Sequence, residues 1–249
     1  MHPDLRIIEP QLFAIGDTRF RVVMDRYDEF KTTPDEVVIL KPLQWFEYYA
    51  ALIRERQVMN LVELGIFEGG SALLFGLLFD ELRVVSVDIR PPDQPVLDHL
   101  ARLGLADRVK LYYGVSQDDR QTLGAMLAAE FGTDPVDMVV DDASHQYGLS
   151  RASFEILFPQ LRQGGVYVIE DWAWAHWDGI FQNDLWLDAP ALSNLVFELT
   201  MLAGGRPDLI DRLDIRRGTV TAIKSAPYPL AEFQLDSAYL MRGRQLQKI

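Results

Sequence analysis

The stretch MNLVELGIFEGGS, residues 59–71, decides the fold. A short apolar run opens it, and glycines at positions 65, 69 and 70 follow at once. Glycines let a chain turn sharply and let a ligand approach the backbone closely. We therefore expect a buried strand, a ligand-binding turn and a helix in this order. The alternative is a glycine-rich turn that binds nothing.

Similar apolar runs recur downstream, and longer amphipathic stretches separate them. This alternation predicts a mostly parallel α/β sheet, doubly wound and covered by helices on both faces. The expected strands are 59–64, 83–88, 109–114, 136–141 and 165–170, and the expected helices lie near 70–80, 94–103, 119–131 and 150–162. Residues 213–226 add an antiparallel hairpin at one edge, which completes a Rossmann-like sheet of seven strands.

Residues 1–57 precede this sheet and form a separate N-terminal extension, whereas 58–249 form the main domain. The extension contains TRFRVVMDRY (18–27) and EVVILKP (36–42), which predict a small strand pair, and a helix near 43–56. An extension of this kind covers a pocket or makes a subunit contact. We accordingly expect a homodimer.

Composition narrows the class of protein. Apolar residues make up 49% of the 249 residues and charged residues 24%, as in ordinary globular domains. The net charge of −13 would repel nucleic acid and anionic lipid, so we expect neither as a partner. The absence of cysteine excludes disulfides and thiolate zinc sites. No membrane span or leader is evident, and the expected compartment is the cytoplasm.

Acidic residues follow three of the expected strands. Asp88 ends the second strand, about 20 residues beyond the glycine loop, where an acid can accept hydrogen bonds from both hydroxyls of a ribose. The fourth strand ends at Asp141-Asp142, with His145 close behind, and the fifth at Glu170-Asp171. Like charges at one rim of a sheet favour a divalent cation, and oxygen ligands favour Mg²⁺. Helix capping and surface exposure are the alternative roles of these acids.

Two segments resemble class I S-adenosylmethionine-dependent methyltransferases. The segment ELGIFEGG (63–70) resembles their first motif, E-x-G-x-x-x-G. The segment VVDDASHQYGLSRASFEILFPQLRQGGVYVIEDW (139–172) resembles the macrocin and mycinamicin sugar O-methyltransferases and the related cephalosporin-hydroxylase-like proteins. Ala143 departs from the usual Gly, and Glu170 replaces the Asp of the macrolide enzymes, which bears on the exact coordination of a metal.

The resemblance implies S-adenosylmethionine and Mg²⁺ as cofactors. It places Mg²⁺ on Asp142, Glu170 and Asp171, and it makes His145 the general base. The residues expected at the S-adenosylmethionine site are Glu63, Gly65, Gly69, Gly70, Ser71, Asp88, Ser116, Gln117 and Asp141.

Aromatic residues follow the last acidic pair. Trp172, Trp174 and Trp177 lie around His176, and Trp186 comes soon after. Indole faces stack on sugars and on planar rings, so we expect an acceptor pocket here. The alternative is an aromatic cluster that closes the core or a subunit contact.

The remaining histidines have no such neighbours. His176 is a candidate second acid or base, whereas His2 and His99 are expected at the surface.

Together these features predict a Mg²⁺-dependent O-methyltransferase that acts on a hydroxyl of a sugar, a glycosylated metabolite or an oligosaccharide. Neighbouring hydroxyls that can chelate a metal also occur on catechols, so a phenol O-methyltransferase is one alternative. The other is a cofactor-binding protein without transferase activity.

Overall fold

The structure is a computed structural model that describes residues 4–26, 29–182, 189–226 and 233–249. Internal contacts divide the chain into two compact units, residues 1–115 and 116–249. Within the described ranges, no helix has the length and apolar character needed to cross a membrane.

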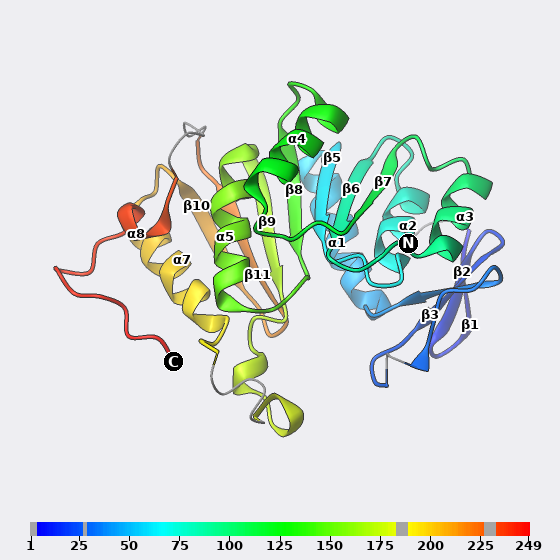
Figure 1. The fold of residues 1–249 in the computed structure, drawn as a ribbon, viewed down its shortest axis with the longest axis horizontal. Helices are drawn as coiled ribbons and strands as arrows, with labels where there is room; N and C mark the ends of the chain where they lie inside the picture. Colours follow the sequence, from blue (N-terminus) through cyan, green and yellow to red (C-terminus); the bar gives the residue numbers. More distant parts are fainter. Residues whose placement is uncertain (1–3, 27–28, 183–188, 227–232) are drawn as a thin grey trace. The chain divides into compact units, whose positions relative to one another are not determined.

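The first unit holds two sets of strands, with α-helices between the strands of the second set (Figure 1). Its elements are β1 (Leu5–Glu9), β2 (Leu12–Ile15), β3 (Thr18–Val22), β4 (Glu36–Ile39), α1 (Leu43–Arg56), β5 (Asn60–Leu64), α2 (Gly70–Leu78), β6 (Arg83–Asp88), α3 (Gln94–Arg102) and β7 (Val109–Tyr113). All five residues of β5 are buried, as expected of a parallel strand covered on both faces.

The second unit continues with strands and helices in alternation. Its elements are α4 (Arg120–Phe131), β8 (Val136–Asp141), α5 (Tyr147–Leu157), η2 (Phe158–Gln160), β9 (Leu161–Glu170), η3 (Trp174–His176), η4 (Gly179–Gln182), α7 (Ser193–Gly205), β10 (Ile210–Ile215), β11 (Thr219–Lys224) and α8 (Leu235–Ala238). Helices α5 and α7 lie side by side, and β8 is buried along its whole length.

The expected sheet is confirmed. Its seven strands are ordered β10-β11-β9-β8-β5-β6-β7. The pairs β5–β6, β6–β7 and β8–β9 are parallel, whereas β11 runs antiparallel to both β9 and β10. The expected hairpin at one edge is therefore present, with β10 beginning at Ile210 rather than near position 213.

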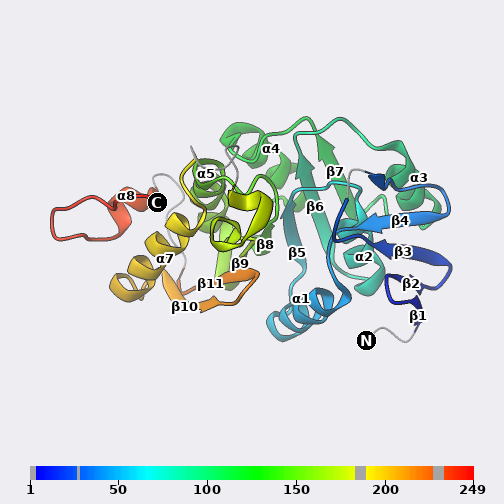
Figure 2. The ribbon, with the colours of Figure 1, turned by 90° about the horizontal axis from the view of Figure 1, so that it is seen from below.

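The N-terminal extension is larger than the strand pair that the sequence predicts. Strands β3 and β4 do pair, in parallel, and β1 and β2 extend them to a four-stranded sheet in the order β1-β2-β3-β4. Figure 2 shows this small sheet beside α2, which contacts β4. The expected helix at 43–56 is confirmed as α1.

Two helices differ from expectation. The helix expected at 150–162 ends at Leu157, because Pro159 has no N–H to continue it, and the chain is already a strand at Leu161. Helix α7 was not predicted, since its N-cap is Leu192 and no side chain caps its first turn.

The surface position expected of His99 is wrong. Its side chain is buried, with Nε2 at 2.7 Å from the carbonyl oxygen of Thr33 and Nδ1 at 2.8 Å from the Arg102 guanidinium. His2 and Trp186 lie outside the described residues.

Candidate functional site

The glycine loop, residues 65–71, joins β5 to α2 in the first unit. Gly65 and Gly69 have φ angles of +97° and +76°, in the left-handed region that favours glycine. A Cβ on Gly70 would lie 2.3 Å from the carbonyl oxygen of Val38 in β4, and one on Gly69 would lie 2.3 Å from a methyl group of Val96 in α3. The loop is therefore pressed between the small sheet and α3, at a distance that only glycine allows.

Asp88 fixes the shape of this loop. One of its carboxylate oxygens accepts hydrogen bonds from the backbone N–H groups of Ile66 and Phe67, each at 2.9 Å. The other accepts from the N–H of Arg90, also at 2.9 Å. The proposed ribose ligand thus holds the turn that the glycine motif forms, and its contact with a ribose remains a prediction.

Glu63 and Ser71 lie on either side of the loop. Glu63 is fully buried in β5 and accepts a 2.7 Å hydrogen bond from the Ser86 hydroxyl in β6. Ser71 is buried in the first turn of α2. Both residues lie where the sequence places them, at the end of the first strand and the start of the first helix.

Glu68 ties the loop to the N-terminal extension. Its buried carboxylate accepts from Lys31 Nζ and from the backbone N–H of Thr32, both at 2.9 Å, and its carbonyl oxygen accepts from the Thr32 hydroxyl at 2.9 Å. Burial raises the pKa of Glu68, but hydrogen bonds from Thr32, Lys31 and Asp93 together outweigh it and lower the pKa. Burial and the Glu68 carboxylate raise the pKa of Asp93 to about 6.

Sequence reasoning missed Lys31 and Thr32. They lie 36 or more positions before Glu68, and no spacing rule connects a residue in an irregular segment with a loop so far along the chain.

A buried polar network supports the loop after β8 in the second unit. Asp141 accepts from the Ser153 hydroxyl at 2.7 Å and the Tyr167 hydroxyl at 3.1 Å, and Gln117 Nε2 lies 3.3 Å from its other oxygen. Gln117 Oε1 accepts from the backbone N–H of Ser144 at 3.1 Å. Burial raises the pKa of Asp141 to about 6, although its hydrogen bonds oppose this rise.

This network clarifies the positions of three predicted cofactor ligands. Asp141 and Gln117 are buried and hold the turn that follows β8, while Ser116 hydrogen-bonds to Asp118 at the surface. Contacts of all three with a cofactor remain predictions.

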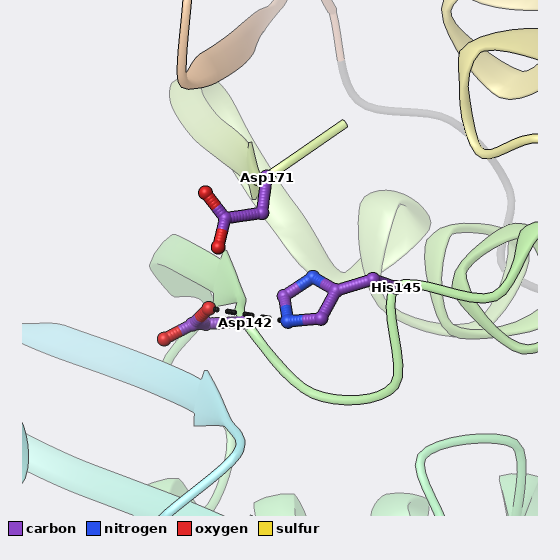
Figure 3. A group of neighbouring side chains, drawn as sticks. All are labelled: Asp142, His145 and Asp171. Atoms are coloured by element: carbon purple, nitrogen blue, oxygen red, sulfur yellow. Dashed lines mark ion pairs between the residues drawn. The ribbon is translucent and has the colours of Figure 1, made fainter. Parts of the chain in front are cut away.

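Asp142, His145 and Asp171 form a carboxylate–histidine cluster (Figure 3). One ligand atom of each lies within 4.8 Å of the others, and His145 Nε2 is 3.8 Å from an oxygen of Asp142. The imidazole extends between the two carboxylates, which come from the loops after β8 and β9. Two acids beside one imidazole can hold a divalent cation through oxygen and leave a nitrogen close to a bound hydroxyl.

Backbone conformation sets this cluster. His145 and Asp171 have φ angles of +53° and +54°, an uncommon region for residues other than glycine. The Asp171 N–H donates to the carbonyl oxygen of Gly218 at 2.8 Å, which anchors its turn to the β10–β11 hairpin. Such conformations persist where surrounding structure enforces them, and they concentrate at functional sites.

Glu170 takes a different position from Asp171. It is the last residue of β9, it is buried, and it is paired in register with Thr219 of β11. The cluster found among the described residues therefore contains two of the three predicted metal ligands, together with the predicted base.

A cavity of about 280 Å³ adjoins His145. Trp172, Trp174 and His176 line it, whereas Trp177 packs edge-on against Phe181 with ring centroids 5.6 Å apart. That this cavity binds an acceptor stays a prediction. The other lining residues are Gln146, Ala175, Phe181, Gln182, Ala189, Pro190, Ala191, Leu192 and Ile249. Sequence reasoning missed the wall formed by residues 189–192 and Ile249.

Ring contacts and hydrogen bonds hold the tryptophan and histidine side chains that line the cavity. The Trp174 ring lies 4.1 Å from the His145 ring between centroids, and the Trp172 indole N–H donates to the carbonyl oxygen of Arg216 at 2.8 Å. His176 Nε2 lies 2.9 Å from the hydroxyl oxygen of Ser193. Two histidines and two indoles thus present hydrogen-bonding and stacking groups to one cavity.

Comparison with protein families finds a similarity over the middle of the chain. Residues 62–172 match the model of a family described as a methyltransferase domain. This part of the chain, which contains the glycine loop and the carboxylate–histidine cluster, is similar to the methyltransferase domains of that family.

Two individual relatives show which methyltransferases the chain resembles. The chain is 33% identical over 147 residues to mycinamicin VI 2''-O-methyltransferase of Micromonospora griseorubida, across 55% of this chain and 34% of that one. It is 38% identical over 133 residues to 8-demethyl-8-(2-methoxy-alpha-L-rhamnosyl)-tetracenomycin-C 3'-O-methyltransferase of Streptomyces olivaceus, across 51% of this chain and 30% of that one. The chain thus spans about a third of the length of these relatives.

Solved structures agree on the fold. The MycE methyltransferase of the mycinamycin biosynthetic pathway, in complex with Mg and SAH, aligns with a TM-score of 0.54 at 24% identity, over 74% of this chain and 50% of that one. An O-methyltransferase from Bacillus cereus in complex with SAH aligns with a TM-score of 0.53 at 18% identity, over 75% and 83%. At these identities the likeness concerns the fold alone.

Proposed function

We propose that this protein is an S-adenosylmethionine-dependent and Mg²⁺-dependent O-methyltransferase that acts on a sugar hydroxyl of a glycosylated small molecule. The observation that carries the proposal is the cluster of Asp142, His145 and Asp171 beside a cavity walled by Trp172 and Trp174. The relatives that methylate sugars on mycinamicin and tetracenomycin support the acceptor class.

Each unit has a distinct task in this proposal. The first holds S-adenosylmethionine through Asp88 and the backbone of the glycine loop, whose turn depends on the positive φ of Gly65 and Gly69 and on the close packing of Gly70. The second binds the metal and the acceptor. We keep residues 1–57 as the extension and 58–249 as the catalytic domain, in a homodimer.

Proton removal from the acceptor falls to His145. The acceptor oxygen attacks the methyl carbon of the sulfonium, the C–S bond breaks with its electron pair left on sulfur, and Nε2 of His145 takes the hydroxyl proton. When bound, Mg²⁺ on Asp142 and Asp171 would orient two neighbouring hydroxyls and lower the pKa of the one that is methylated. Trp172 and Trp174 would stack on the sugar ring.

The test is product formation with matched variants. Purified protein is incubated with S-adenosylmethionine, Mg²⁺ and either an alkyl rhamnoside or a catechol, and methylated product is detected by mass spectrometry. We expect a methylated rhamnoside and complete loss of product in excess EDTA. Asp142→Asn should also abolish turnover, whereas Asp178→Asn, an exposed acid beyond the cluster, should not.

Three results would contradict the proposal in different ways. Methylation of the catechol alone would show that the acceptor is a phenol rather than a sugar. Full turnover in EDTA, with the metal content of the protein measured, would show that the reaction does not need a metal. Calorimetric binding of S-adenosylhomocysteine with no product from any acceptor would leave a cofactor-binding protein.

A further inference from the structure

Asn194 holds the backbone of Ile249 at the start of α7. The Ile249 carbonyl oxygen accepts from Asn194 Nδ2 at 2.8 Å and from the Ala191 N–H at 2.7 Å, while the Ile249 N–H donates to Asn194 Oδ1 at 3.1 Å. Asn194 Nδ2 also donates to the Ala191 carbonyl oxygen at 2.7 Å. The amide is fully buried and uses both of its N–H groups and its oxygen.

A second contact fastens the same segment. Nζ of Lys248 lies 4.5 Å from the ring centroid of Tyr147, the first residue of α5. Tyr147 is itself buried, and its hydroxyl donates to Glu198 in α7 at 3.1 Å. Residues 248 and 249 are thus attached to both α5 and α7, and Figure 1 shows the red segment after α8 ending beside α7.

The Ile249 side chain has the opposite character from its backbone. Its backbone is held by three hydrogen bonds, yet the residue is 61% exposed and lines the cavity that His145 and Trp174 also line. Pro190 and Leu192 continue this apolar wall. A fixed apolar group that remains accessible in a pocket is placed to contact the apolar part of a ligand.

We propose that Ile249 is an acceptor-contacting residue that sets specificity for the apolar portion of the acceptor, and that Asn194 is the positioning residue that holds it in the cavity. This inference rests on the proposed function for the identity of the acceptor. In this inference the segment after α8 recognises the group attached to the sugar. The aromatic and histidine side chains recognise the sugar itself.

The first experiment compares methyl and octyl α-L-rhamnoside as acceptors. Because truncating one apolar side chain in a pocket changes discrimination by roughly tenfold or more, Ile249→Ala should reduce the preference for the octyl compound about tenfold. The loss should appear in KM, with kcat and the use of the methyl compound unchanged. Leu240→Ala, which truncates a side chain that is 95% exposed, is the matched control and should keep the preference.

The second experiment examines the positioning role without turnover. Asn194→Asp keeps the size and the acceptor oxygen but loses both N–H groups and brings a negative charge to two carbonyl oxygens. Amide hydrogen exchange should become faster at Ile249 and Ala191, and the preference for the octyl compound should fall as in Ile249→Ala. An unchanged exchange rate at Ile249 would overturn the role of Asn194.

Calorimetry separates this inference from the proposed function. Octyl rhamnoside is titrated into the wild-type protein and Ile249→Ala with Mg²⁺ and S-adenosylhomocysteine present. Weaker binding to the variant supports the inference even if no rhamnoside is methylated, and in that case only the proposed activity fails. Equal binding to both proteins, or no binding to either, overturns the assignment of Ile249.

Discussion

The glycine loop and the carboxylate–histidine cluster are built in different ways. The loop is fixed by its backbone, because Asp88 binds three N–H groups and Gly69 and Gly70 contact neighbouring elements at distances that exclude a Cβ. The cluster is an arrangement of side chains on two turns, with His145 and Asp171 in left-handed conformations. A change of residue type should therefore destroy function in the cluster and structure in the loop.

The largest effect is expected from His145→Asn. Asparagine tolerates a positive φ, so the variant removes the imidazole while keeping the turn. Loss of a positioned base should lower kcat by roughly 10²–10⁴-fold, with the melting temperature and the affinity for S-adenosylhomocysteine unchanged.

His176→Asn is the matched control for the loss of an imidazole from the same cavity. It should lower kcat far less than His145→Asn does. A near-normal kcat and an unaltered pH profile in His145→Asn would instead assign proton removal to another group.

An intermediate effect is expected from Gly70→Ala. The added methyl group meets the carbonyl oxygen of Val38 and the Cβ of Ile39, so the variant should lose about 1–3 kcal/mol of unfolding free energy and bind S-adenosylhomocysteine more weakly. Chemical denaturation and calorimetry measure the two quantities.

Gly124→Ala makes the same substitution where nothing lies within 4 Å, inside α4. It should stabilise the protein by roughly 0.5–1 kcal/mol, since alanine is the better helix residue. If Gly70→Ala and Gly124→Ala both raised or both lowered the free energy of unfolding, close packing would not explain the shape of the glycine loop.

The smallest effect concerns pH. Because the pKa of Asp93 in the folded protein is about 6, above its ordinary value of 3.8, the unfolded chain releases this proton first as pH rises. Stability is therefore lost between roughly pH 4 and pH 6 and stays lower above that range. Asp93→Asn should not change the melting temperature near pH 4 but should raise it at pH 7.5.

Asp98→Asn, at an exposed position in α3, is the matched control for Asp93→Asn, which removes a charge from the N-cap of the same helix. If the melting temperatures of Asp93→Asn and the wild-type protein differed by the same amount at every pH, the interaction between the Asp93 and Glu68 carboxylates would not be the cause.

The difference between the two regions also explains what the sequence predicts. Buried parallel strands are continuous apolar runs, and a turn with positive φ requires glycine, so the sheet and the loop could be predicted from local patterns. The cluster could be predicted in part, since Asp142 and His145 lie three residues apart and Asp171 follows the next strand. Glu170 is the last residue of β9 and Asp171 is the first residue after it, so which of the two carboxylates joins the cluster depends on where the strand ends. The sequence defines the end of a strand less sharply than its buried centre.

Other features could not be predicted, because their partners are distant in sequence. The burial of His99 depends on a carbonyl oxygen 66 residues earlier, and the position of Ile249 depends on an asparagine 55 residues earlier. Helix α7 has no capping side chain to mark its start. Such contacts follow from tertiary packing rather than from a periodic pattern.

The contact between Thr32 and Glu68 has a consequence for how such a chain can evolve. Thr32 and Lys31 donate to the buried carboxylate of Glu68, and β4 forms the surface against which Gly70 rests. Recombination that exchanged the first 57 residues for an unrelated segment would take two hydrogen-bond donors from this carboxylate, leaving Arg90 and Asp93, and would expose one side of the loop. Inheritance of the two segments is thereby linked, so a change at position 68 should be accompanied by changes at positions 31 and 32 among descendants of this chain.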